Sequence, residues 1–203
     1  RSLLESRVTP TVPQASESAD GARYIDELMP LYHFVERHSL NIPAEPLCIW
    51  NAMQRVKVNG SKLVRLAVWL RMLGAARSGK SQPVKAIFDL DGMPSFLRLH
   101  ANEPRELCLG MVGQFWKLSG GLTEINSDAF SEFDDGMSAK LVWGFLLEPI
   151  DQGTRLSTET RVHCSSKSAR LRFLPYWFVI RPVSGLIRGQ ILQDIKAEAM
   201  RSN

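Results

Sequence analysis

One stretch of the chain matches a motif of nucleotide-binding proteins. Residues 74–81 have the sequence Gly-Ala-Ala-Arg-Ser-Gly-Lys-Ser, which fits the phosphate-loop pattern G-x-x-x-x-G-K-S. In such a site a buried strand precedes the loop, and a helix begins at the lysine so that backbone N–H groups hold the phosphates. Here the preceding segment has helical periodicity, and Pro83 would fall within the first turns of the required helix. We therefore interpret residues 74–83 as a polar loop.

A second stretch carries two aspartates at a spacing that some phosphatases use. Residues 86–92, Ala-Ile-Phe-Asp-Leu-Asp-Gly, resemble the opening motif of haloacid-dehalogenase-like phosphatases, in which the first aspartate is the nucleophile. That chemistry also needs a lysine and further acidic residues holding Mg²⁺ at later strand ends of a parallel sheet. The sequence after Gly92 has neither a G-D-x-x-x-D motif nor alternating strands and helices. A turn with two solvated carboxylates is the better interpretation.

The remaining reactive residue types are dispersed along the chain. The three cysteines, Cys48, Cys108 and Cys164, form no CxxC pair and no Cys/His cluster with zinc-ligand spacing. The four histidines are also far apart, and no Ser or Cys has the spacing of a nucleophile motif. We therefore expect free thiols in a reducing, cytoplasmic environment, and we expect neither a metal nor a cofactor.

Composition indicates one globular domain of ordinary polarity. The chain has 203 residues, of which 44% are hydrophobic and 23% are charged. The net charge of +4 is small, and the basic residues are scattered among acidic ones, so we expect no nucleic-acid partner. No run approaches the roughly 20 apolar residues that span a bilayer, which argues against stable membrane insertion.

The N-terminal part of the chain predicts an arm, a strand and two helices. Residues 1–22 are rich in Ser, Thr, Pro and Ala without apolar periodicity, which predicts a flexible or extended arm before one domain at 23–203. A helical turn is expected near Ile25–Met29, and residues 32–42 alternate like a strand. Helical spacing of apolar residues then predicts two short helices, at 44–56 and 63–73.

The C-terminal part predicts antiparallel strands followed by a long helix. From about Phe96 the apolar period changes to two, and strands are predicted over 105–116, 128–133, 138–148 and 154–164. Short connections between them require antiparallel pairing. The last element runs from about Ser166, a candidate N-cap, to Arg201. Pro182 removes a helical hydrogen bond, so we expect a kink or break near residues 181–184.

This order of elements resembles the helix-grip fold of the SRPBCC superfamily, which includes START lipid-transfer domains, plant pollen-allergen proteins and polyketide cyclases. The resemblance covers roughly residues 24–199. It is carried by Phe34-Val35-Glu36-Arg37-His38-Ser39, Pro46-Leu47-Cys48-Ile49-Trp50, Leu109-Gly110-Met111-Val112-Gly113-Gln114-Phe115-Trp116, Thr154-Arg155-Leu156-Ser157-Thr158-Glu159-Thr160-Arg161-Val162, Arg172-Phe173 and Tyr176-Trp177. It implies an α+β fold in which a curved antiparallel sheet wraps around the C-terminal helix.

The resemblance also implies a cavity between the sheet and the C-terminal helix that holds an apolar ligand. Its walls would include Leu109, Met111, Phe115, Leu141, Trp143, Phe145, Phe173, Trp177 and Ile180. Equally, these residues could simply form a packed core.

A polar spot is expected within those walls. Glu36 and His38 share a strand face with apolar residues, so they need partners if that face is buried. The resemblance makes the first and last strands neighbours, and Glu159 or Arg161 could then be the partners. Such a group could orient a ligand, act as acid and base, or be a structural ion-pair network. The strand register decides which face points inward.

These observations lead to three hypotheses. The first is binding or carriage of a hydrophobic small molecule, such as a lipid or a sterol-like or polyketide-like compound, without catalysis. The second is a small cyclase, hydrolase or dehydratase that uses Glu36 and His38, the candidate catalytic residues. The third is a non-catalytic interaction module with a filled core, dimerising through the exposed face of the sheet.

Overall fold

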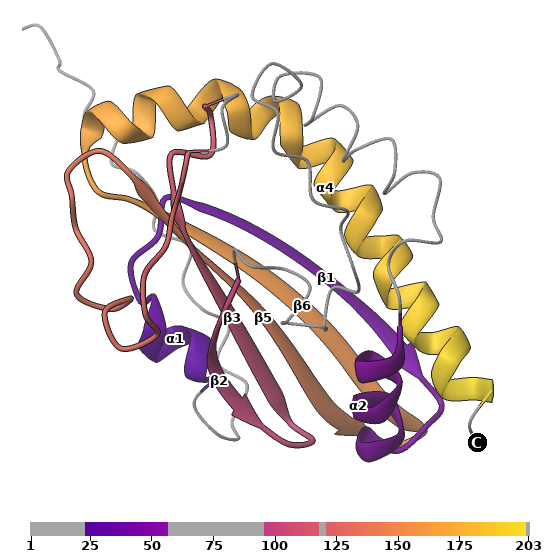
Figure 1. Ribbon diagram of the computed structural model, residues 1–203. Coiled ribbons are helices and arrows are strands. Elements are labelled where there is room, and N and C mark those ends of the chain that lie inside the picture. The colour runs from indigo at the N-terminus through magenta and orange to yellow at the C-terminus, as the bar shows by residue number, and fades with distance from the viewer. Residues whose placement is uncertain (1–22, 57–95, 118–120, 202–203) are drawn as a thin grey trace, which may run out of the picture.

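The computed structural model describes residues 23–56, 96–117 and 121–201 (Figure 1). Four features of the sequence lie outside these residues: the arm at 1–22, the helix predicted at 63–73, and the motifs at 74–81 and 86–92. The described part is an antiparallel sheet with a long C-terminal helix across one face and shorter helices beside it (Figure 1).

Within the described residues the sheet has six strands, all paired antiparallel. They are β1 (Phe34–Ile42), β2 (Leu97–Asn102), β3 (Glu106–Gly113), β4 (Leu122–Thr123), β5 (Ala139–Ile150) and β6 (Gly153–Cys164). The order across the sheet is β1-β6-β5-β3-β2, and β4 pairs with β3. The first and last strands are therefore neighbours, as the resemblance implies, and the predicted alternating segments around 32–42, 105–116, 138–148 and 154–164 are confirmed as strands.

The two longest strands form a hairpin with a tight turn. Ile150 pairs with Gly153, which leaves only Asp151 and Gln152 between the strands. Gly153 has a φ of 117°, a backbone conformation that only glycine adopts easily. Because the turn must contain this glycine, the position of Gly153 in the sequence determines the register of β5 against β6.

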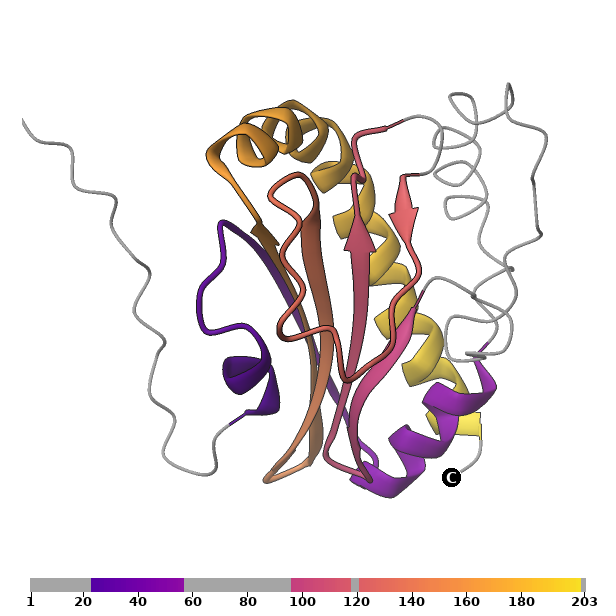
Figure 2. The same cartoon turned by 60° about the vertical axis from the view of Figure 1, so that its left-hand side comes forward.

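Three helices are described, and they lie on different faces of the sheet. Helix α1 (Tyr24–Leu28) packs on one face, whereas α2 (Pro46–Arg55) and α4 (Lys167–Arg201) pack on the other (Figure 2). We call the face that carries α1 the outer face, and the face that carries α2 and α4 the inner face. Helix α2 has Pro46 at its first turn, where the missing N–H costs nothing.

Helix α4 begins as the sequence predicts but does not break at its prolines. The amide of Ala169 donates to Ser166 Oγ at 3.1 Å, so Ser166 does cap the helix. Pro175 and Pro182 both lie inside the helix, which stays continuous to Arg201. Its axis bends in the middle (Figure 1), so the structure has the kink but not the break.

One predicted strand is wrong. Residues 128–133 form turns, with Phe130 N donating to Ser127 O and Phe133 N donating to Ala129 O. These local bonds satisfy the backbone without a neighbouring strand. The apolar residues Phe130 and Phe133 lie three positions apart, which is a turn or helix spacing, and Phe130 is fully buried against the outer face.

The inner face carries most of the core, in two apolar clusters. The first joins α2 and the end of α4 to the sheet through residues such as Met53, Leu156 and Ile195. The second joins the start of α4 to the sheet through Phe34 and Phe173. A curved antiparallel sheet gripping a long C-terminal helix is the helix-grip arrangement, and the fold class is α+β.

Candidate functional site

The inner face holds a partly buried polar cluster between its two apolar clusters. Glu36 and His38 point inward from β1, where they pair with Thr160 and Thr158 of β6. His38 Nε2 lies 2.9 Å from Glu36 Oε1, and the Glu36 side chain is only 7% exposed. We call Glu36, His38, Trp143, Thr158, Thr160, Ser184 and Arg188 the inner polar cluster.

Helix α4 supplies the positive charge of this cluster. The guanidinium of Arg188 donates to Thr160 Oγ1 and to Ser184 Oγ, and its Nε lies 4.0 Å from Glu36 Oε2. It also lies over the ring of Trp143, 5.1 Å from the centroid, which is a cation–π geometry. Burial lowers the pKa of Arg188 to about 10, against the opposite effect of Glu36, so the group remains charged at neutral pH.

The indole of Trp143, on β5, is held in place by hydrogen bonds on the sheet side of the cluster. Its Nε1 donates to Thr158 Oγ1 at 2.6 Å, and that hydroxyl donates in turn to the carbonyl of Gly144 at 3.1 Å. Both polar groups are thereby satisfied, as buried groups normally are. The guanidinium of Arg188, from α4, lies over this ring.

Within the described part of the chain, Glu36, unlike Trp143 and Thr158, has a side-chain oxygen whose hydrogen-bonding capacity is not satisfied. Its Oε1 contacts His38, but its Oε2 is buried and has no hydrogen-bond partner among the described residues. Helix α4 approaches this carboxylate closely at Gly185, where an added Cβ would lie 2.8 Å from Oε1. The cluster therefore contains an acceptor with unused capacity beside a buried cation.

The nine apolar residues predicted as cavity walls all lie on the inner face or on α4. Most are buried and packed against one another, as in the contact of Trp143 with Phe145 at 4.9 Å between ring centroids. They divide between the two apolar clusters: Leu109, Trp143 and Phe145 in the first, Met111, Phe115, Phe173, Trp177 and Ile180 in the second, and Leu141 in contact with both. A role for them as ligand walls stays a prediction.

Glu159 and Arg161, by contrast, lie on the outer face, away from Glu36 and His38. The register pairs Arg37 with Glu159 and Val35 with Arg161, and these side chains point away from α4. The prediction that either residue would be the partner of Glu36 was therefore wrong. The reason is geometric, because neighbouring residues of a strand point to opposite faces.

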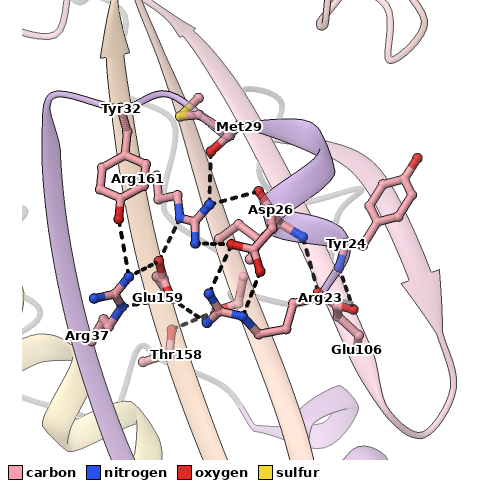
Figure 3. Close-up of polar contacts among 12 residues, drawn as sticks. Arg23, Tyr24, Asp26, Met29, Tyr32, Arg37, Glu106, Thr158, Glu159 and Arg161 are labelled. Atoms are coloured by element: carbon pink, nitrogen blue, oxygen red, sulfur yellow. Dashed lines mark hydrogen bonds and ion pairs between the residues drawn. The ribbon is translucent and has the colours of Figure 1, made fainter. Parts of the chain in front are cut away.

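On the outer face these two residues belong to an ion-pair network that holds α1 (Figure 3). Arg161 is 2% exposed and donates from Nε to Glu159 at 2.6 Å. Its other nitrogens donate to Asp26 and to the carbonyls of Ile25 and Met29, at the end of α1. The outer ion-pair network, Arg23, Asp26, Arg37, Glu159 and Arg161, thus positions a helix too short to stay folded alone.

The opposite end of α1 is held by Glu106 of β3. Its carboxylate accepts hydrogen bonds from the backbone amides of Tyr24, at 3.0 Å, and Ile25, at 3.3 Å (Figure 3). These are first-turn amides without helical partners, which carboxylates characteristically cap. Because the charges of Glu106 and of the outer ion-pair network hold α1, we interpret these residues as structural.

A groove of about 850 Å³ runs along the outer face beside α1. Its lining comes mostly from outward-pointing polar and charged positions of β1, β5 and β6, including Arg37, Asn41, Glu148 and Arg155. A second hollow of about 340 Å³ lies near Trp50 of α2. Neither coincides with the apolar cavity that the resemblance implies between sheet and helix.

Sequence reasoning missed the residues that α4 contributes to the inner polar cluster. Ser184 and Arg188 continue the inward stripe of Phe173, Trp177 and Ile180 at four-residue steps. Polar residues at core-facing positions of a helix are a signal that could have been read from the sequence. Thr158 and Thr160 pair with His38 and Glu36 on the inward side of β6, but the sequence left open which face of that strand points inward.

Comparison with known proteins gives similarity of fold only. No family model and no curated relative match the chain. Solved structures that it resembles include a Polyketide_cyc-like protein from Corynebacterium glutamicum (15% identity, covering 81% of this chain and 88% of that one, TM-score 0.33). Others are a protein from Thermus thermophilus (8%, 84% and 99%, 0.30) and Ara h 8.0201 (11%, 84% and 99%, 0.30). At these identities and scores the matches carry no functional argument.

Proposed function

We propose that the chain binds a mostly apolar small molecule whose polar end contacts the inner polar cluster. The observation that carries this proposal is Glu36 Oε2, a buried carboxylate oxygen without a hydrogen-bond partner among the described residues. Leaving such an acceptor unpaired costs roughly 1–3 kcal/mol or more, so a ligand that donates a hydrogen bond to it would be stabilised. A hydroxyl or amide group would suit this position.

The surroundings of Glu36 support the same ligand chemistry. Arg188 lies 4.0 Å away and carries N–H groups that could donate to a ligand carbonyl or carboxylate. Apolar side chains flank the cluster on both sides, as they do in sites that hold a largely apolar molecule by a few polar groups. The expected ligand is therefore an amphiphile with a hydrogen-bonding head, in the class of lipids, sterol-like compounds and polyketides.

The test is native mass spectrometry of protein purified from its own host, followed by extraction and identification of the bound compound. The recovered compound or a lipid panel should then raise the melting temperature. In Glu36→Gln and Arg188→Met variants we expect the ligand-induced shift to fall to less than half. The control Glu124→Gln, at an exposed position, should keep the full shift.

Two outcomes would contradict the proposal. One is an empty protein that no member of the panel stabilises, which would favour an interaction module with a filled core. The other is stabilisation that is unchanged in both cluster variants, which would place the ligand elsewhere in the molecule.

An acid/base enzyme is the second candidate, and one contact favours it. His38 Nε2 lies 2.9 Å from Glu36 Oε1, which is the geometry in which a carboxylate orients an imidazole. The His38 side chain is 31% exposed, so a substrate could reach it. A His38→Gln variant that binds the ligand but no longer converts it would distinguish catalysis from carriage, whereas equal turnover would exclude this role for His38.

A further inference from the structure

The start and middle of α4 expose large apolar side chains on the surface opposite to the core. Leu171 is 70% exposed, Phe178 68%, Val179 75% and Leu186 60%. The same stretch buries Phe173 and Trp177 on its inner side. This part of the helix is therefore apolar on two sides, and packing on the sheet explains only one of them.

The exposed apolar residues form one continuous stripe along the helix. Leu171, Leu174, Phe178, Pro182 and Leu186 follow one another at steps of three or four residues. At 3.6 residues per turn, such steps place them on one side of the helix. We call this set, together with Val179 at its edge, the α4 stripe. Figure 2 shows α4 crossing the inner face of the sheet.

Positive charges border the α4 stripe, and acidic residues are absent from this part of the sequence. Residues 160–193 contain no Asp or Glu. At 100° per residue, Arg170 and Arg181 fall on one side of the stripe and Arg172 falls on the other. All three are exposed, and none forms an ion pair with an acidic residue in the part of the chain that the structure describes.

We propose that the α4 stripe and its arginines dock this protein on the surface of an anionic membrane. Helices that lie in the membrane interface combine an apolar stripe carrying Leu and Phe with flanking Lys and Arg. The apolar side chains enter the boundary between headgroups and acyl chains, while the arginines contact lipid phosphates. The docking is peripheral, because no described helix is long and apolar enough to cross a bilayer.

A second copy of the chain fits this surface less well. In a two-fold symmetric contact through the stripe, the arginines of one protomer would face the same arginines of the other. Like charges brought together in this way oppose association, whereas anionic headgroups neutralise them. Charge complementarity thus favours the membrane over self-association.

The experiment is co-sedimentation of the full chain with vesicles of phosphatidylcholine alone or mixed with phosphatidylglycerol. We expect binding to the mixed vesicles only, weakened when salt is raised from about 0.1 M to about 0.5 M. A Phe178→Ser/Val179→Ser variant and an Arg172→Gln/Arg181→Gln variant should each bind at least about tenfold more weakly. A matched control, Leu31→Ser/Arg155→Gln, changes exposed residues away from α4 and should bind like the wild type.

Three results would overturn the proposal. The first is no binding to the anionic vesicles, and the second is undiminished binding by both α4 variants. The third is a wild-type dimer, seen by light scattering, that becomes monomeric in the α4 variants without any vesicle binding. Thermal unfolding of every variant within a few degrees of the wild type confirms that the fold is intact, as expected for exposed positions.

Discussion

Replacing Glu159 with Gln should strongly lower the free energy of unfolding at neutral pH. The effect should become small at low pH, where Glu159 itself is protonated. The substitution keeps the shape of the side chain but removes the negative charge from among three arginines. Glu159 accepts from Arg161 Nε at 2.6 Å and from Arg23 at 2.8 Å, and Arg37 Nε lies 2.9 Å away. Its side chain is 8% exposed, so solvent does little to screen these contacts.

The magnitude follows from the pKa of this carboxyl group. Burial by itself would raise the pKa of Glu159, but hydrogen bonds from Arg37 and Arg161 and the nearby positive charges outweigh it and lower the pKa to about 2. Relative to an ordinary value of 4.5, this difference corresponds to roughly 3 kcal/mol of folding free energy. Removing one partner of a buried ion pair typically costs about 3–5 kcal/mol, in agreement.

The sign of the pH dependence is also determined. Because the pKa is lower in the folded state, the stabilisation is fully present above pH 4.5 and is lost as the pH falls towards about 2. Urea unfolding of wild type and Glu159→Gln should therefore differ by about 3 kcal/mol at pH 7 and much less near pH 2.5. The exposed control Glu124→Gln should change stability by less than about 0.5 kcal/mol. A variant as stable as the wild type at neutral pH, or an equal difference at both pH values, would refute this reasoning.

Two further predictions concern other parts of the fold. Gly153→Ala should cost about 1–3 kcal/mol, since the φ of 117° strains any side chain and the new Cβ would lie 2.2 Å from the Ile42 carbonyl oxygen; a melting temperature equal to that of the wild type would contradict this. In the native protein at pH 8, a thiol reagent should modify Cys48 well before the other cysteines. Burial raises the pKa of Cys164 to about 11 and raises that of Cys108 as well, with Glu106 adding to the effect on Cys108, and rapid labelling of either buried thiol by peptide mapping would count against it.

The two faces of the sheet use polar residues for different purposes. On the outer face Arg161 donates to Glu159 and to the carbonyls of Ile25 and Met29, so the fold explains the charges of these two residues. On the inner face Glu36 keeps an unused acceptor next to Arg188. Unsatisfied buried groups are rare in folded proteins, and this contrast is why we place the proposed ligand at the inner polar cluster.

The sequence by itself determined the elements and their alternation. Strands around β1, β3, β5 and β6 were predictable because a period of two is a local property of the chain, and Ser166 marked the start of α4 for the same reason. The failure at residues 128–133 is instructive. Two apolar residues near polar ones suggested a strand, but the local turn hydrogen bonds and the burial of Phe130 under the outer face decided otherwise.

Only the tertiary structure decided which side chains meet. In the register of β1 with β6, Glu36 lies opposite Thr160, and a slip of one residue would have placed Arg161 there instead. Arg188 on α4 forms an ion pair with Glu36, although it lies 152 positions further along the chain. It can reach Glu36 because Gly185 lets the helix approach β1 closely. Periodicity identifies the face on which a residue lies within its own element. The pairing of elements, which selects the neighbours, depends on contacts that no local pattern encodes.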